Sequence, residues 1–167
     1  MQGAGPAGAR TGNHEDWYHQ HMAEVDNAKL GSGVISSPME ALNYRKRGYT
    51  VQTNWKEGYI SLGDIELIHG TYCGVHTCKK HLEVMKRNVA YVHTHSIGCH
   101  TEDKIASYNI GWGGDKSSKA FGYMTRIQKE KWRNGFASVY VDNNGKSHLN
   151  QLELINESVH FRGKIYK

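Results

Sequence analysis

A strand–helix–strand pattern between residues 65 and 92 constrains the fold of this chain more than any other feature. Residues 65–68 (Ile-Glu-Leu-Ile) form a compact run typical of a short strand. Residues 77–87 place Leu82 and Met85 on one side and lysines on the other, as in an amphipathic helix. Residues 88–92 (Asn-Val-Ala-Tyr-Val) then read as a short buried strand. Two strands joined by a helix at this spacing predict the α/β class, with a parallel or mixed sheet covered by helices.

Further elements are expected on both sides of this pattern. Two helices are predicted upstream, at residues 16–30 and 38–47, because a glycine follows each stretch. The other segments alternate in polarity like strands and lie at residues 50–53, 59–62, 136–141, 148–155 and 161–166. A turn at residues 142–145 (Asp-Asn-Asn-Gly) joins two of these strands, which predicts a β-hairpin near the end of the chain.

Length and composition favour one domain. With 167 residues and 38% hydrophobic content, the chain is long enough to bury a core. Residues 1–11 are rich in glycine and alanine and are expected to be a flexible lead-in, which leaves residues 12–167 as a single domain. The sequence lacks the apolar core of a signal peptide and any apolar run that could span a membrane, so no membrane partner is expected.

Charge and cysteine content restrict the expected partners and location. The formal net charge of +5 and the pI near 9.1 favour anionic partners, phosphates included. The three cysteines, Cys73, Cys78 and Cys99, cannot all pair with one another. A small, odd set of cysteines favours a reducing, cytoplasmic location over a disulfide scaffold.

Three short segments that contain histidine hold the candidate metal-binding and catalytic residues. They are Gly12-Asn13-His14-Glu15, His69-Gly70 and His93-Thr94-His95. The second and third each follow a predicted strand, and ligands gather at the carboxyl ends of strands in open α/β sheets. The first lies just before a predicted helix, where backbone N–H groups can receive an anion such as phosphate. Imidazole nitrogens and amide oxygens suit zinc, manganese or iron, so the set predicts one metal site built from three loops.

In their order and residue types, these segments resemble the motifs of the calcineurin-like metallophosphoesterase superfamily. That family carries Asp-x-His, Gly-Asp-x-x-Asp, Gly-Asn-His-Glu/Asp, a lone His often followed by Gly, and Gly-His-x-His; this chain shows the last three, from Gly12 to His95. The hairpin near the C-terminus is similar as well, and the resemblance extends from about residue 12 to the end. It implies the C-terminal part of an α-β-β-α sandwich, with a mixed sheet and flanking helices.

The resemblance implies a phosphoester hydrolase with two divalent metal ions (Mn, Fe or Zn) and assigns roles by matching position. Asn13, His69 and His93 would bind one metal ion and His95 the other. Asn13 and His14 would also contact the phosphoester substrate, which could be a nucleotide or a nucleic acid. His14 would act as the general acid, with Asp16 or Glu15 holding its imidazole.

Two departures from the family pattern bear on activity. The Asp-x-His and Gly-Asp-x-x-Asp segments are absent, and no aspartate precedes Asp16. Val92 stands where the family usually has glycine. Neutral ligands without an anionic one bind a dication weakly, because nothing offsets the lost hydration of the ion. We therefore hypothesise that the chain alone has weak or no activity, and that a missing N-terminal half or a partner chain completes the site.

Three other interpretations remain open at this point. A structural zinc site is conceivable at Cys73, His76, Cys78 and His81, although buried thiols beside surface histidines explain these residues better. The basic pI, ten tyrosines and four tryptophans also suit a non-catalytic nucleic-acid-binding module. Residues 107–114 are either an active-site rim loop, with Tyr108 and Asn109 as guessed substrate contacts, or an ordinary glycine-rich turn.

Overall fold

The computed structural model describes residues 8–10, 42–52, 54 and 56–167, and the chain divides into two compact units, residues 1–60 and 61–167. In the first unit, strand β1 (Gly8–Arg10), which belongs to the expected lead-in, pairs in parallel with β2 (Thr50–Gln52). The β2 strand was predicted at residues 50–53. The helix predicted at residues 16–30 lies outside the described residues.

The helix predicted at residues 38–47 is wrong for its described part, because residues 42–48 form hydrogen-bonded turns. The Arg47 N–H donates to the carbonyls of both Asn43 and Tyr44, as in a single turn that does not continue. Asn43 has a φ of 51°, outside the helical region, and Gly48 has a φ of 81°. Left-handed backbone at these two positions ends any right-handed helix between them.

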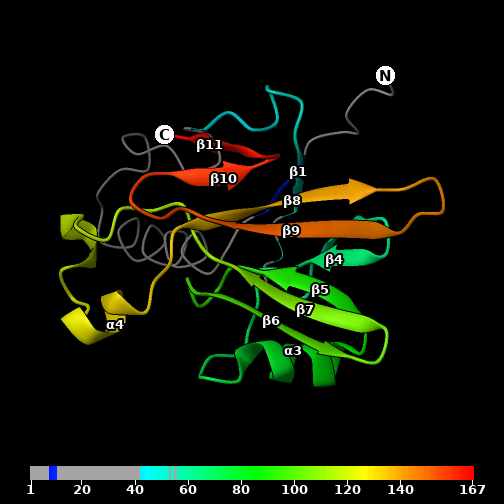
Figure 1. Ribbon diagram of the computed structural model, residues 1–167, viewed down its shortest axis with the longest axis horizontal. Coiled ribbons are helices and arrows are strands. Elements are labelled where there is room, and N and C mark those ends of the chain that lie inside the picture. Colours follow the sequence, from blue (N-terminus) through cyan, green and yellow to red (C-terminus); the bar gives the residue numbers. More distant parts are fainter. Residues whose placement is uncertain (1–7, 11–41, 53, 55) are drawn as a thin grey trace, which may run out of the picture. The chain divides into compact units, whose positions relative to one another are not determined.

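The second unit is built on a five-stranded mixed sheet (Figure 1). Its strands, in spatial order, are β3 (Ile60–Leu62), β4 (Ile65–Leu67), β5 (Asn88–Tyr91), β7 (Ile105–Ile110) and β6 (Ile97–Glu102). Strands β4, β5 and β7 run parallel, and β6 pairs antiparallel with β7 at the edge. The predicted α/β class with a mixed sheet is confirmed.

Helix α3 (Thr77–Met85) covers one face of this sheet (Figure 1). Leu82 of this helix and Val89 and Tyr91 of β5 are at most 1% exposed, and the Tyr91 hydroxyl contacts Thr77 and Cys78 of the helix. The helix ends at Lys86, whose φ is 50° and whose N–H donates to the Leu82 carbonyl. The strand–helix–strand prediction is therefore confirmed to within two residues. Among the described helices, none has the length and apolar character needed to cross a membrane.

The β6–β7 hairpin is a correction to the sequence analysis, which expected residues 107–114 to be a loop or turn. Strand β7 is a central strand of the sheet, and its Ser107 and Asn109 are fully buried. Polar residues on a buried strand hide the alternation that identifies strands from sequence. Asn109 can be buried because its amide donates to Thr94 Oγ1 and Ser96 Oγ.

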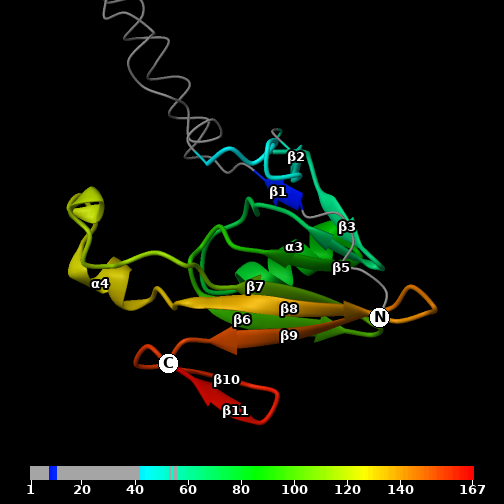
Figure 2. The same ribbon diagram turned by 90° about the horizontal axis from the view of Figure 1, so that it is seen from above.

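The predicted C-terminal hairpin is confirmed as β8 (Gly135–Val141) and β9 (Ser147–Glu153). It lies on the side of the sheet opposite α3, over β6 and β7 (Figures 1 and 2). The Gln151 amide of β9 donates to the Gly98 and Asn109 carbonyls, which joins the hairpin to the β6–β7 pair.

The single last strand predicted at residues 161–166 is instead a second hairpin, β10 (Val159–Phe161) with β11 (Lys164–Tyr166). Arg162 and Gly163 have φ values of 49° and 75°. Two successive residues with positive φ match a two-residue hairpin turn, and so the chain reverses between the two halves of the predicted strand.

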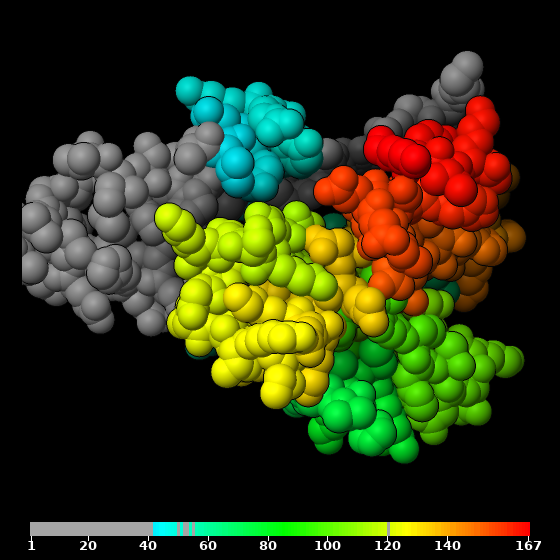
Figure 3. All heavy atoms as spheres, turned by 60° about the vertical axis from the view of Figure 1, so that its left-hand side comes forward, coloured from blue at the N-terminus to red at the C-terminus, as the bar shows by residue number. Residues whose placement is uncertain are grey.

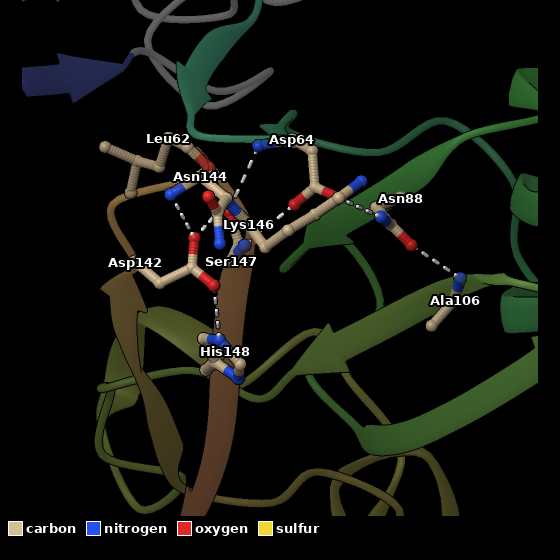
Figure 4. Close-up of polar contacts among 9 residues, drawn as sticks. All are labelled: Leu62, Asp64, Asn88, Ala106, Asp142, Asn144, Lys146, Ser147 and His148. Atoms are coloured by element: carbon tan, nitrogen blue, oxygen red, sulfur yellow. Dashed lines mark hydrogen bonds and ion pairs between the residues drawn. The ribbon is translucent and has the colours of Figure 1, made fainter.

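A polar network around Asp64 joins the hairpin to the sheet (Figure 4). The Asp64 carboxylate accepts hydrogen bonds from the Ser147 N–H at 2.8 Å, from Lys146 Nζ at 3.1 Å and from the Asn88 amide at 3.3 Å. In return, Ser147 Oγ accepts from the Asp64 N–H at 3.2 Å and donates to the Leu62 carbonyl. One carboxylate thus connects the β3–β4 turn, the start of β5 and the start of β9.

Replacing Asp64 with alanine should lower the free energy of unfolding by about 2 kcal/mol, because three donors lose a charged acceptor. The Ser147 N–H is the main cause that lowers the pKa of Asp64 below 3.8, with burial opposing it and Lys146 adding to it. A lowered carboxyl pKa means that this stabilisation is present above 3.8 and is lost as the pH falls through the folded-state pKa. Urea unfolding of Asp64→Ala checks the prediction. The control is Glu102→Ala, an exposed carboxylate at the end of β6; equal losses in the two variants would contradict it.

Candidate metal centre

Two of the predicted ligands, His69 and His93, lie side by side at the carboxyl ends of β4 and β5. The parallel pairing of these strands continues past their ends, since the Ile68 N–H donates to the Ala90 carbonyl. The His69 carbonyl then accepts from the N–H groups of both Val92 and His93, at 3.2 and 3.0 Å. Parallel strands deliver their carboxyl ends to one edge of a sheet, so two residues 24 positions apart in the sequence become neighbours.

The two imidazole rings approach each other through their nitrogens. His93 Nδ1 lies 3.1 Å from His69 Nε2, and the ring centroids are 5.0 Å apart with an angle of 68° between the planes. Both residues are half-buried. As a hydrogen bond, this contact needs a proton on one nitrogen and a lone pair on the other. With both nitrogens deprotonated, the same two lone pairs can bind one cation.

Gly70 allows this approach. Its φ is 98°, a conformation that favours glycine. A Cβ atom at this position would lie 2.9 Å from Tyr91 Cδ2 and 3.0 Å from His93 Cβ. The chain can therefore turn away directly after His69 only because this residue has no side chain. His-Gly at the end of a strand was part of the predicted metal motif. The structure explains why glycine is needed there, because the backbone has a positive φ and no room for a Cβ atom.

His95 lies in an aromatic cluster, formed by His95, Trp112, Phe121 and Trp132. Its ring stacks on Trp112, with a centroid distance of 4.7 Å and an interplanar angle of 10°, and meets Trp132 edge-on at 4.8 Å. Phe121 contacts both tryptophans, at 5.3 and 5.2 Å. Stacking uses the face of the imidazole, whereas a metal ion would bind a nitrogen at its edge. The stack on Trp112 therefore orients the imidazole ring through its face.

Asn109 holds the loop that carries His93 and His95. Its amide donates to Thr94 Oγ1 and, at 2.7 Å, to Ser96 Oγ, and these two hydroxyls lie 3.0 Å apart. The backbone closes the same loop as a tight turn, because the His95 N–H donates to the Val92 carbonyl. Asn109 is thus fully buried and supports the loop of the candidate ligands, which differs from the substrate contact guessed from sequence.

His81 supports the loop that follows His69, and sequence analysis misplaced it as a surface histidine. The side chain is 1% exposed and stacks on Tyr91 at 3.8 Å. Its Nε2 accepts from the N–H groups of Thr71 and Tyr72, and its Nδ1 donates to the Thr77 carbonyl. Buried histidines are hard to recognise because their hydrogen-bond partners come from backbone groups that carry no sequence signal.

The same contacts argue against zinc at Cys73, His76, Cys78 and His81. Both ring nitrogens of His81 already have backbone partners, and Cys78 Sγ accepts from the Tyr91 hydroxyl at 3.2 Å. Cys73 is exposed and Cys78 is buried. In the part of the chain that the structure describes, no group of three or more His, Cys, Asp or Glu side chains is arranged to hold a metal ion.

The structure thus brings together His69 and His93, and it places His95 on the loop that follows His93. The other predicted site residues, Asn13, His14, Glu15 and Asp16, lie outside the described residues. The two groups that sequence reasoning missed, His81 and Asn109, act on the backbone of the ligand loops.

Comparisons with known proteins add a distant structural likeness. No family model matches the sequence, and no curated protein sequence shows significant similarity to it. Among solved structures, the chain is similar to a single mutant of Vps29 from Entamoeba histolytica, with 15% identity and a TM-score of 0.46. The similarity covers 86% of this chain and 87% of the Vps29 chain. The function proposed below therefore rests on the residues of this chain.

Proposed function

We propose that this chain carries the histidine ligands of a divalent-metal centre that hydrolyses phosphoesters. The observation that carries the proposal is the contact between His69 Nε2 and His93 Nδ1, 3.1 Å apart at the ends of adjacent parallel strands. The order of the motifs, from Gly12-Asn13-His14-Glu15 through His69-Gly70 to His93-Thr94-His95, supports the same function and the resemblance to calcineurin-like metallophosphoesterases.

The donor set of this pair fits a metal ion. Imidazole nitrogens are common ligands of zinc, manganese and iron. Two nitrogens that each lie about 2.1 Å from one ion, at an angle of roughly 95–110°, are about 3.1–3.4 Å apart. The observed separation of 3.1 Å lies in that range. The half-buried position also limits competition from water without isolating the pair from a substrate.

In the proposed site, Asn13, His69 and His93 hold one metal ion and His95 holds a second. Bound divalent ions would supply Lewis acidity toward a phosphoryl oxygen. Asn13 and His14 would contact the phosphoester, and His14 would give a proton to the leaving oxygen while Asp16 or Glu15 holds its imidazole. Because the family's Asp-x-His and Gly-Asp-x-x-Asp segments are absent from this sequence, we expect slow turnover by the chain alone.

Metal titration tests the proposal directly. We expect the full chain to bind Mn²⁺ or Zn²⁺ in isothermal titration calorimetry, and His69→Ala or His93→Ala to weaken binding roughly 100-fold, because the loss of one ligand removes a direct bond to the metal. The control is His160→Ala on β10, an exposed histidine outside the candidate centre. Circular dichroism shows whether each variant keeps its fold.

The same proteins give a second readout, hydrolysis of bis(p-nitrophenyl) phosphate with added manganese. Slow turnover that disappears with EDTA and in His93→Ala is the expected result. Equal metal affinity in the parent chain and in both histidine variants would overturn the proposal, as would hydrolysis that persists in His93→Ala.

A further inference from the structure

The segment between two residues of the aromatic cluster forms a basic arm, residues 113–131. Trp112 precedes the arm and Trp132 follows it, and their rings are 4.8 Å apart. The backbone closes the base of the arm, because the Arg133 N–H donates to the His95 carbonyl at 2.8 Å and the Trp112 N–H donates to the Arg133 carbonyl. The two ends of the arm therefore lie close to His95. His95 itself belongs to the loop that carries the candidate ligands.

The conformation of the arm is defined by local contacts. It contains a 3₁₀ turn (Lys119–Phe121) and the short helix α4 (Arg126–Glu130). Thr125 and Gln128 cap this helix reciprocally, and Arg126 pairs with Glu130 at 2.7 Å. Phe121 ties the middle of the arm to the tryptophans. Figure 3 shows the arm, in lime to yellow, at the surface of the second unit.

Positive charge is concentrated in this arm. Its 19 residues include five lysines and arginines against two acids, a net charge of +3 out of the chain's formal +5. Arg126 is neutralised by Glu130. Within the part of the chain that the structure describes, no ion pair involves the other four basic side chains, Lys116, Lys119, Lys129 and Lys131.

A cavity of about 490 Å³ opens between the two ends of the arm, lined by Lys116, Ser117, Arg126, Lys129 and Glu130. Of the lining cations, Arg126 is paired with Glu130, whereas Lys116 and Lys129 have no ion pair in the described part of the chain and favour an anionic ligand. The arm also carries Lys119 and Lys131, which are exposed and do not line the cavity. A single phosphate group could not contact all of these separated lysines, whereas the successive phosphates of a polymer could.

Exposed apolar side chains accompany these charges. Tyr123 and Ile127 are both 70% exposed on the same arm. Single-stranded nucleic acids are bound by this combination, in which basic side chains follow the phosphates and an aromatic ring stacks on a base. We infer that the basic arm binds single-stranded nucleic acid and brings its phosphodiester backbone to the candidate metal centre. The inference rests on the proposed function for the role of the arm, and it adds the substrate class.

Fluorescence anisotropy with a labelled 20-nucleotide oligothymidylate tests the inference. EDTA is present, so binding is measured without any contribution from metal. We expect Lys116→Glu/Lys129→Glu to weaken binding at least tenfold and to reduce the slope of log K against log salt by about 1.4, since each phosphate contact contributes about 0.7 for a single strand. Tyr123→Ala should weaken binding roughly tenfold and leave the salt slope unchanged, because stacking involves no ion release.

The matched control is Lys104→Glu/Lys164→Glu, which makes the same change in charge at exposed positions outside the arm. Equal losses in the two double variants would overturn the inference, because binding would then follow net charge alone. Equal binding of inorganic polyphosphate and oligothymidylate, with no effect of Tyr123→Ala, would overturn the assignment to nucleic acid.

This test is separate from that of the metal centre. The anisotropy assay contains EDTA and measures no metal binding, and the calorimetric titration contains no oligonucleotide. Failure of oligonucleotide binding therefore leaves the metal titration unaffected, and failure of metal binding leaves the anisotropy result unaffected.

Discussion

Replacing Gly70 with alanine should destabilise the second unit by about 3 kcal/mol, the sum of a positive φ forced on an L-residue and of overpacking. The φ of 98° is unfavourable for alanine, and the new methyl group would lie 2.9 Å from the Tyr91 ring. Tyr91 of β5 is 1% exposed and stacks on His81 of α3, so its ring has little room to move. The methyl group would also push on His93, and we expect metal affinity to fall together with stability.

The matched control is Gly74→Ala, because Gly74 has a similar φ of 105° but has no atom within 4 Å of the added Cβ. The control should lose only the backbone contribution, about 1 kcal/mol. Urea unfolding followed by tryptophan fluorescence measures both variants, and metal titration gives the second readout. A loss in Gly70→Ala no larger than that in Gly74→Ala would show that the packing against Tyr91 and His93 is unimportant.

Acid should destabilise the protein through His81 well before carboxylates are protonated. Burial is the main cause that lowers the pKa of His81 below 6.5; the Thr77 carbonyl opposes it, and the nearby His93 lowers it further. As the pH falls below 6.5, the unfolded chain takes up a proton on this histidine and the folded chain does not. Stability is therefore complete above 6.5 and falls with pH down to the folded-state pKa, by at most about 1.4 kcal/mol per pH unit for one proton.

His81→Gln is the variant that isolates this effect. Glutamine can still accept a hydrogen bond from the Thr71 N–H but does not titrate. We expect a smaller dependence of unfolding free energy on pH between 6.5 and 5 in this variant than in the parent chain, measured by urea unfolding at each pH. Identical pH dependence in the two proteins would contradict the assigned protonation state of His81. Near-UV circular dichroism at each pH checks that both proteins begin folded.

The strand–helix–strand core could be predicted because its information is local. Apolar residues repeat with the period of a helix in α3, and they make up most of the short strands β4 and β5. The C-terminal hairpin was equally readable, since alternating strands flank an Asn-Gly turn. The order of His69 and His93 after these strands also predicted that they would meet, because parallel strands end at one edge of the sheet.

Other parts could not be read from the sequence because their partners are distant or are backbone groups. Strand β7 looks like a polar loop until Thr94 and Ser96 supply partners for Asn109. The sequence suggests that His81 is a surface residue. In the fold it is buried, because its nitrogens form hydrogen bonds with the Thr71 N–H and the Thr77 carbonyl. Most buried polar groups have hydrogen-bond partners, and for His81 and the Asn109 amide nitrogen the chain acquires those partners only on folding.

The amino-acid sequence by itself determined the α/β class, the β4–α3–β5 core and the β8–β9 hairpin of the second unit, and which histidines are the candidate ligands. Only the tertiary structure decided how those histidines are held. It placed Gly70 against Tyr91, His81 under the loop after His69, and His95 against Trp112. The reason is physical: periodicity records which face of an element is buried, whereas the contacts that orient a ligand join residues far apart in the chain.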